Sequence, residues 1–179
     1  VDRASLIAMG GDSRAWAVSA ANTHVVALAR HDERFGKAMS AFDLICPDGM
    51  PLVWAINRDR SDGERLEDRV YGPTLMLETF RASTEKGEVR HFLFGGTQET
   101  LHRLTDRLAS NYPDAKVVGS YSPPFGVWPS GEFETICSKL SEVKANVVWV
   151  GLGCPKQEIW IGENKEALPP AVYLGVGAA

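Results

Sequence analysis

The stretch NVVWVGLGCPKQE, residues 146–158, decides the fold class of this chain. It begins with a nearly continuous apolar run, VVWV at 147–150, without the alternation that marks a strand with one face in water. Strands buried on both faces have this composition, and such strands belong to parallel sheets covered by helices. Two glycines and a proline then lead into a polar segment. The stretch therefore predicts a strand, a tight loop, and a helix that starts at Pro155.

Short runs of the same kind recur on both sides of this stretch. Together they predict six strands: Ala15–Ala20, Phe42–Cys46, Val89–Phe94, Lys116–Tyr121, Asn146–Gly151 and Ala171–Val176. Strands that alternate with helical segments imply a single Rossmann-like α/β domain with a mostly parallel sheet and helices on both faces. Ligands bind such sheets beyond the carboxyl ends of the strands, so functional residues are expected directly after each strand.

The segments between the strands carry the period of a helix. Three leucines between 101 and 108 lie on one helix face after Thr97, and a second helix with the same period follows Ser130. Both residues are of the types that cap helix N-termini, so we expect side-chain caps at both positions. A further helix is expected to open at Gly72-Pro73, because proline in the first turn loses no hydrogen bond.

The composition limits the classes of function. The chain has 179 residues, 44% hydrophobic and 23% charged, which suits one soluble domain over residues 1–179. Its net charge of -4 and the mixed charges between Arg58 and Arg69 argue against a nucleic-acid partner. No apolar run approaches the ~20 residues of a membrane-spanning helix.

The cysteines and the chain ends give two further expectations. Cys46, Cys137 and Cys154 are too few and too scattered for a disulfide framework or a zinc site, so a reducing interior is expected. The chain begins without methionine and stops on an apolar, glycine-rich stretch. We therefore expect a C-terminal segment to be missing, and an apolar end of this kind can promote self-association.

The end of the second predicted strand reads CPDGMP, residues 46–51, with Asp48 at the apex of a turn. An Asp that faces a cleft at this edge has its pKa raised by desolvation toward the range of a general base. The alternative is that Asp48 caps the helix beginning near Pro51. The local pattern alone favours the cap.

Two glycines, Gly95 and Gly96, follow the third predicted strand and precede Thr97. Glycines between a strand and a helix let backbone N–H groups approach an anion, and a phosphate or diphosphate is the natural ligand. A plain tight turn explains the pair equally well, because the pattern is neither GxGxxG nor a Walker loop.

The loop after residues 146–151 carries the most distinctive polar residues. Behind Gly151 and Gly153, Lys156 offers a point charge for phosphate, and Gln157 offers both donor and acceptor groups. Glu158 can bind a sugar hydroxyl. The alternative is ordinary surface polarity in a first helical turn.

Two further segments keep both a functional and a structural interpretation. Asn22, after the first strand, either caps the next helix or reaches a ligand. The stretch SPPFGVWP, residues 122–129, either stacks on a sugar or lipid or forms a stiff cover. His24 and His31 have no third ligand nearby in the sequence, so no metal is assigned.

Read together, these stretches resemble the WecG/TagA/CpsF family of bacterial glycosyltransferases. The resemblance rests on Asn22, the PDG turn at 47–49, RVYGP at 69–73, Gly95-Gly96, and GLGCPKQE at 151–158, and runs from about 17 to 177. It implies an inverting hexosyl transfer from a UDP-sugar onto a polyprenyl-diphosphate-linked saccharide, in the synthesis of bacterial surface polysaccharides. The enzyme would be cytoplasmic and peripheral at the inner face of the plasma membrane.

The resemblance also assigns residues. It makes Asp48 the catalytic base, which now favours that role over the helix cap. The substrate-binding residues that it implies are Asn22, Thr23, Gly49, Arg69, Gly95, Gly96, Gly151, Gly153, Pro155, Lys156, Gln157 and Glu158. The Asp-x-Asp motif of metal-using glycosyltransferases is missing from the sequence, so we expect metal-independent transfer without a cofactor.

Two rival hypotheses remain open. Gly151-x-Gly153 after a strand is also found in nicotinamide-dependent oxidoreductases, but Lys156 occupies the position of the third glycine of GxGxxG. No acidic residue follows near ~20 residues on, where such enzymes bind the ribose. The second rival is a nucleotide-binding module without transferase activity.

Overall fold

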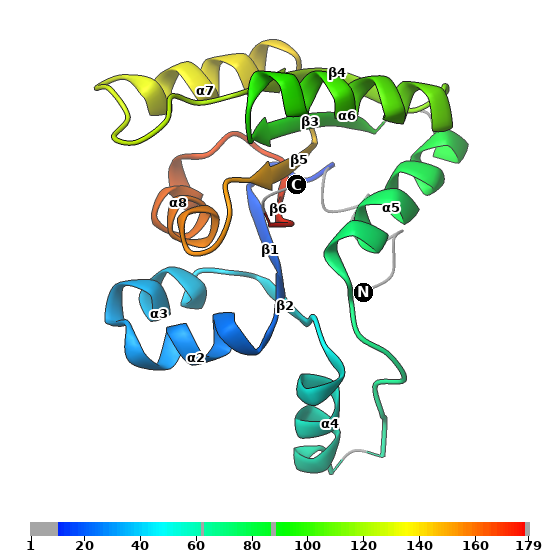
Figure 1. Cartoon of the computed structure of the whole chain (residues 1–179), viewed down its shortest axis with the longest axis vertical. Helices are drawn as coiled ribbons and strands as arrows, with labels where there is room; N and C mark the ends of the chain where they lie inside the picture. The colour runs from blue at the N-terminus through cyan, green and yellow to red at the C-terminus, as the bar shows by residue number, and fades with distance from the viewer. Residues whose placement is uncertain (1–10, 62, 87–88, 178–179) are drawn as a thin grey trace.

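The computed structural model describes residues 11–61, 63–86 and 89–177, and its centre is a six-stranded sheet (Figure 1). Every pair of neighbouring strands is parallel. The strands are β1 (Trp16–Ala21), β2 (Leu44–Pro47), β3 (Arg90–Gly95), β4 (Lys116–Tyr121), β5 (Val147–Gly151) and β6 (Val172–Gly175), in the order β2-β1-β6-β5-β3-β4. The sheet is thus all-parallel in the described residues, where the sequence predicted a mostly parallel one.

Helices cover both faces of the sheet, which confirms the predicted Rossmann-like α/β architecture (Figure 1). The helices are α2 (Thr23–His31), α3 (Glu33–Ser40), α4 (Met50–Asp59), α5 (Gly72–Lys86), α6 (Gln98–Asn111), α7 (Glu132–Glu142) and α8 (Lys156–Asn164), with a short 3-10 turn, η1 (Lys165–Ala167). Helices α5 and α6 pack on one face, and α7 and α8 on the other. Helix α3 packs against α8, and α2 packs against α3.

The apolar runs form strands because both faces of the sheet are buried. In β5, Trp149 points into the core under α5 and α6, while Val148 and Val150 point into the core under α7 and α8. In β3, Leu93 points into the core under α5 and α6, and Phe92 points into the core under α7 and α8. Successive side chains of a strand alternate between faces, so a strand with two buried faces carries apolar residues throughout.

The N-termini of α5, α6 and α7 can be compared with the helix starts and caps predicted from the sequence. Thr97 caps α6, with its Oγ1 accepting a hydrogen bond from the backbone N–H of Thr100 at 3.1 Å. Helix α5 begins at Gly72, as predicted. The predicted cap at Ser130 is wrong: Gly131 precedes α7 with a φ of 87° and makes no side-chain cap. The chain there turns through a left-handed conformation, which suits glycine.

Histidine 91 lies in the core and makes a complete hydrogen-bond chain. Its ring stacks on Phe80 with centroids 3.9 Å apart, and the Trp149 indole N–H donates to Nδ1 at 3.2 Å. Because the indole only donates, Nδ1 must accept, so Nε2 carries the proton and donates to Ser83 Oγ at 3.0 Å. Ser83 in turn donates to the Phe80 carbonyl at 2.7 Å. Only the neutral imidazole satisfies this chain.

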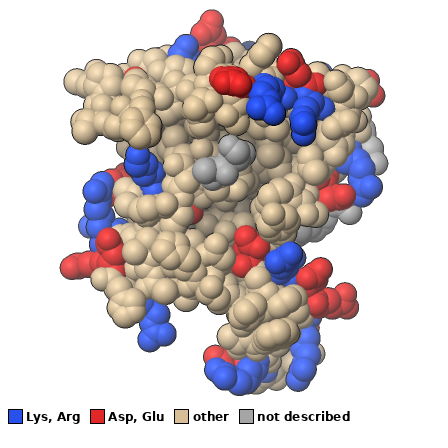
Figure 2. Space-filling model, viewed as in Figure 1, with Lys and Arg blue, Asp and Glu red and all other residues tan. Residues whose placement is uncertain are grey.

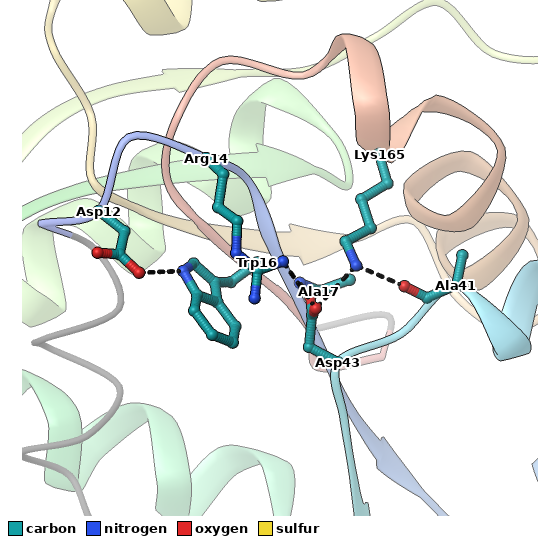
Figure 3. Close-up of polar contacts among 7 residues, drawn as sticks. All are labelled: Asp12, Arg14, Trp16, Ala17, Ala41, Asp43 and Lys165. Carbon is teal, nitrogen blue, oxygen red and sulfur yellow. Dashed lines mark hydrogen bonds and ion pairs between the residues drawn. The ribbon is translucent and has the colours of Figure 1, made fainter.

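A cluster around Asp43 joins the start of β1 to the turn after α8 (Figure 3). The Asp43 carboxylate accepts hydrogen bonds from Arg14 at 3.0 Å, from the Ala17 N–H at 2.8 Å and from Lys165 Nζ at 2.8 Å. Lys165 also donates to the Ala41 carbonyl at 2.8 Å. Burial alone would raise the pKa of Asp43, but these donors outweigh burial and lower it. The cluster lies at the amino end of β1, away from the edge formed by the carboxyl ends of the strands.

Replacing Asp43 with asparagine should lower the free energy of unfolding by about 2–4 kcal/mol, because Lys165 and Arg14 lose their anionic partner. The lowered pKa means that the carboxylate stabilises the fold above about pH 4, its ordinary unfolded value, and that this contribution is lost as the pH falls through the folded pKa. Urea denaturation of Asp43→Asn and of the exposed control Asp59→Asn measures this. Equal loss in both variants would contradict the structural role of Asp43.

His91 gives the fold a second dependence on pH. Burial lowers the pKa of His91 to about 4. Protonation of Nδ1 would point its N–H at the Trp149 indole N–H, which now donates to that nitrogen. Stability should be constant above about pH 7 and fall by up to about 3 kcal/mol between pH 6.5 and pH 4, where only the unfolded chain takes up the proton. His91→Phe should lack this slope. A slope of the same size in His91→Phe would mean that another group titrates.

Candidate active site at the carboxyl edge of the sheet

Three segments distant in the sequence meet at the ends of β1 and β2. The backbone N–H of Asp48 donates to the Ala21 carbonyl at 2.8 Å, and the N–H of Val70 donates to the Pro47 carbonyl at 2.8 Å. These bonds bring Asn22, Asp48 and Arg69 to the same corner of the sheet. The sequence predicted all three as site residues, and the structure places them near one another.

Asp48 does not cap the following helix. Gly49, with a φ of 135°, occupies the cap position of α4, and that helix has no side-chain cap, so the cap alternative is wrong. The Asp48 side chain is half-buried. Burial raises the pKa of Asp48, and the nearby positive charge of Arg69 partly opposes this shift. A carboxylate with a raised pKa is suited to accept a proton.

Asn22 and Thr23 are exposed beside this corner. The side-chain oxygen of Asn22 accepts from the backbone N–H groups of His24 at 3.0 Å and Val25 at 3.1 Å, so its interpretation as the cap of α2 is confirmed. Its amide NH₂ group points away from these two bonds and can still donate to a ligand. A capping role and a binding role for Asn22 are therefore compatible.

Gly95 and Gly96 serve different purposes at the end of β3. A Cβ on Gly95, whose φ is 112°, would lie 2.6 Å from the backbone carbonyl carbon and oxygen of Gly151. A Cβ on Gly96, whose φ is 71°, would meet nothing closer than 3.8 Å. Gly95 is thus required for the close approach of β3 to β5, whereas Gly96 is required only for its backbone conformation.

A cavity of about 430 Å³ opens at the ends of β3, β4 and β5. It lies between the loops that follow these three strands. Its lining residues are Gly96, Thr97, Gln98, Ser122, Pro123, Pro124, Phe125, Gly126, Trp128, Gly151, Leu152 and Lys156. The cavity therefore offers backbone N–H groups, aromatic surface and one cation, and its volume falls in the usual range for small-ligand pockets.

Gln157 and Glu158 lie below this surface. They are 3% and 1% exposed, and Gln157 Nε2 donates to Glu158 Oε1 at 2.8 Å. Gln157 Oε1 accepts from the backbone N–H of Gly177 at 3.1 Å, so Gln157 holds the chain that follows β6. Glu158 Oε2 has no hydrogen-bond partner among the described residues. Both side chains are therefore buried, and neither lines the cavity.

Cys154 and Gly153 complete the loop after β5. Gly153 has a φ of 79°, which favours glycine, and Pro155 immediately precedes α8. Burial and the adjacent Glu158 carboxylate raise the pKa of Cys154 to about 11. The thiol is therefore protonated at neutral pH, and a nucleophilic thiolate is not available here.

The predicted site residues fall into two groups along one edge. Asp48 directly follows β2, and the cavity begins at Gly151 on β5, three strands away in the sheet order. At the usual strand spacing this separation is roughly 14 Å. An extended ligand can therefore reach from the cavity to Asp48, whereas a small one cannot touch both.

Some cavity residues were not among the predicted binding residues. Ser122, Phe125 and Trp128 line the cavity, and Ser122 Oγ donates to the Gly96 carbonyl at 2.7 Å. The proline- and aromatic-rich composition of their loop was the signal in the sequence. In the described part of the chain, no group of three or more His, Cys, Asp or Glu side chains is placed to hold a metal ion.

Comparison with known proteins identifies similar sequences. The family described as "Glycosyl transferase WecG/TagA/CpsF family" matches residues 4–179. The N-acetylglucosaminyldiphosphoundecaprenol N-acetyl-beta-D-mannosaminyltransferase of Bacillus subtilis (strain 168) is 25% identical over 162 residues, which are 90% of this chain and 60% of that protein. The Staphylococcus aureus (strain NCTC 8325) protein of the same name is 28% identical over 162 residues, 89% of this chain and 59% of that protein. The chain thus spans about 60% of the length of these relatives.

Gly95→Ala should separate the ends of β3 and β5 and lower the free energy of unfolding by about 2–4 kcal/mol, because a methyl group 2.6 Å from the Gly151 backbone must displace it. The control Gly96→Ala has open space for its methyl group and should cost only about 1 kcal/mol from backbone strain. Urea denaturation of both variants checks this difference. Equal costs would show that β3 and β5 are not closely packed at Gly95.

Proposed function

The chain belongs to the WecG/TagA/CpsF family of glycosyl transferases, and from this premise we propose that it is an inverting, metal-independent glycosyltransferase. Its donor is a UDP-sugar, and its acceptor is a saccharide linked to polyprenyl diphosphate. The relatives are named as enzymes that transfer N-acetylmannosamine to a diphosphoundecaprenol-linked N-acetylglucosamine, which supports an acceptor of this kind. The product belongs to the synthesis of bacterial surface polysaccharide.

The observation that carries this proposal is the Asp48 carboxylate at the carboxyl edge. It is half-buried, its pKa is raised, and it does not serve as a helix cap. Asp48 accepts the proton of the acceptor hydroxyl while the hydroxyl oxygen forms a bond to the anomeric carbon. The bond from that carbon to the UDP oxygen breaks on the opposite face, so the configuration inverts. One base is enough for this step.

The departing UDP carries negative charge, which needs compensation near the cavity. Lys156 lines the cavity, and Gly95-Gly96 precede the N-terminus of α6. Backbone N–H groups at a helix start, together with a lysine, stabilise a diphosphate without a metal ion. Arg69 is the second cation along this edge, next to Asp48. These groups support metal-independent transfer.

The roughly 14 Å between the cavity and Asp48 suits a nucleotide sugar lying along the edge. We place the nucleotide in the cavity and the sugar toward Asp48, Asn22 and Thr23. Gln157 holds the chain after β6 through its bond to the Gly177 N–H, and Glu158 holds the Gln157 amide in place. We propose that both residues act on the substrate through this support.

The proposed acceptor is attached to a membrane lipid, so the enzyme works peripherally at the inner face of the plasma membrane. Within residues 11–61, 63–86 and 89–177, every helix is too short or too polar to span a bilayer. The rival oxidoreductase hypothesis has little support, because Lys156 replaces the third glycine of the dinucleotide motif.

Asp48→Asn should lower turnover by about 100-fold or more and leave UDP affinity within about twofold, because it removes the base without changing the shape of the site. Transfer from UDP-sugars to a lipid-linked acceptor measures turnover, and calorimetry measures UDP affinity. Asp114→Asn, on the exposed α6–β4 connection, is the matched control. UDP binding without turnover in the wild-type chain would favour the nucleotide-binding module instead.

The Arg69→Met variant tests the assignment of the base more sharply. Arg69 holds the pKa of Asp48 down, so its removal should raise that pKa further. A general base works only when deprotonated, so the acid limb of kcat/KM should move to higher pH in Arg69→Met. An acid limb that stays in place would assign it to a group other than Asp48.

A further inference from the structure

Two apolar side chains at the tip of the β4–α7 loop are fully exposed. Phe125 is 102% exposed and Val127 is 97% exposed. The other large apolar side chains that are exposed in the described residues range from 38% to 64%. Scattered exposed apolar residues are normal on a protein surface, but two complete exposures within three residues form a local apolar surface.

The ends of the loop hold this tip in place. On one side, Ser122 Oγ donates to the Gly96 carbonyl at 2.7 Å. On the other, the Trp128 ring packs edge-on against Phe94 and Trp160, with centroids 6.1 Å and 6.5 Å apart. Two consecutive prolines between these anchors stiffen the backbone. The exposure of the tip is thus a property of an anchored loop.

The charges around the tip suit a lipid surface. Residues 122–130 contain no charged side chain. Figure 2 shows that the protrusion at the upper left, where Figure 1 places the loop before α7, is almost entirely uncharged. Lys156 Nζ lies 5.7 Å from the centre of the Phe125 ring. An apolar tip beside a cation matches a bilayer surface, where acyl chains lie below a layer of phosphates.

We propose that the loop tip, residues 123–127, inserts its uncharged surface into a phospholipid bilayer. The tip borders the cavity at the carboxyl edge, so its insertion would bring the site to the membrane where a lipid-linked acceptor lies. This link to the acceptor rests on the proposed function. A second copy of the chain is a poorer occupant, because a convex tip offers far less than the ~800 Å² per partner of a stable interface.

Flotation with vesicles of equal parts phosphatidylcholine and phosphatidylglycerol tests the proposal. The wild-type chain should bind, and Val127→Ser should lower the partition coefficient by about 10-fold, since a buried valine is returned to water. Phe125→Ser with Val127→Ser should lower it by about 100-fold. The control Leu77→Ser, on the exposed side of α5, should change it by less than twofold. The proposal would be overturned if the double variant bound vesicles as well as the wild-type chain does, or if the wild-type chain did not bind.

A second readout locates the tip in the bilayer. Phe125→Trp should retain vesicle binding, and brominated lipids should quench its added fluorescence relative to the wild type. Unchanged quenching would place the tip outside the bilayer. If the chain instead dimerises in solution and the double serine variant is monomeric, the tip binds a second copy and the proposal is wrong.

An activity measurement separates this proposal from the proposed function. Val127 does not line the cavity, so Val127→Ser should keep its activity on a water-soluble acceptor and lose about 10-fold on the same acceptor anchored in vesicles. Equal activity of Val127→Ser and wild type on both acceptors would contradict membrane insertion. If the wild type uses neither acceptor, the proposed function fails, while the flotation result still decides the role of the loop.

Discussion

The parallel pairing of β3 with β5 brings Gly95 directly opposite Gly151, and the functional edge is built on this contact. Since no Cβ fits at Gly95, the backbones of the two strands are in close contact where the strands end. The cavity forms between the loops that follow these strands, and Ser122 ties the loop after β4 to the Gly96 carbonyl. The pairing of two strand ends thus sets the position of three loops.

Under the proposed function, nucleotide binding and proton transfer take place at different parts of this edge. Lys156 and the glycine-rich loops lie at the ends of β3 and β5, while Asp48, the carboxylate with the raised pKa, follows β2. Between them, Gln157 connects the first turn of α8 to the chain after β6 through the Gly177 N–H. A ligand that spans this distance would contact loops from most of the sheet. Activity would then depend on the relative positions of strands that are distant in the sequence.

The strands were predictable because burial on both faces requires a nearly continuous apolar run, as in VVWV at 147–150. The helix cap at Ser130 was not, because the left-handed turn at Gly131 replaced the side-chain cap. The burial of Gln157 and Glu158 was not predictable either, since polar residues in a first helical turn are usually exposed and the contacts of Gln157 with Gly175 and Gly177 are tertiary ones. The proposed base role of Asp48 rests on the family resemblance, since the local pattern alone favoured the helix cap, which the structure rules out.

Calorimetric titration of the chain with UDP, in the presence and absence of a chelator, is the sharpest test of a metal-independent sugar-nucleotide site at this edge. We expect UDP to bind with the same affinity in both conditions, because Lys156 and backbone N–H groups compensate the charge of the diphosphate. Binding that disappears with the chelator would contradict metal-independent recognition. A failure to bind UDP in either condition would contradict the assignment of this edge as a sugar-nucleotide site in the chain.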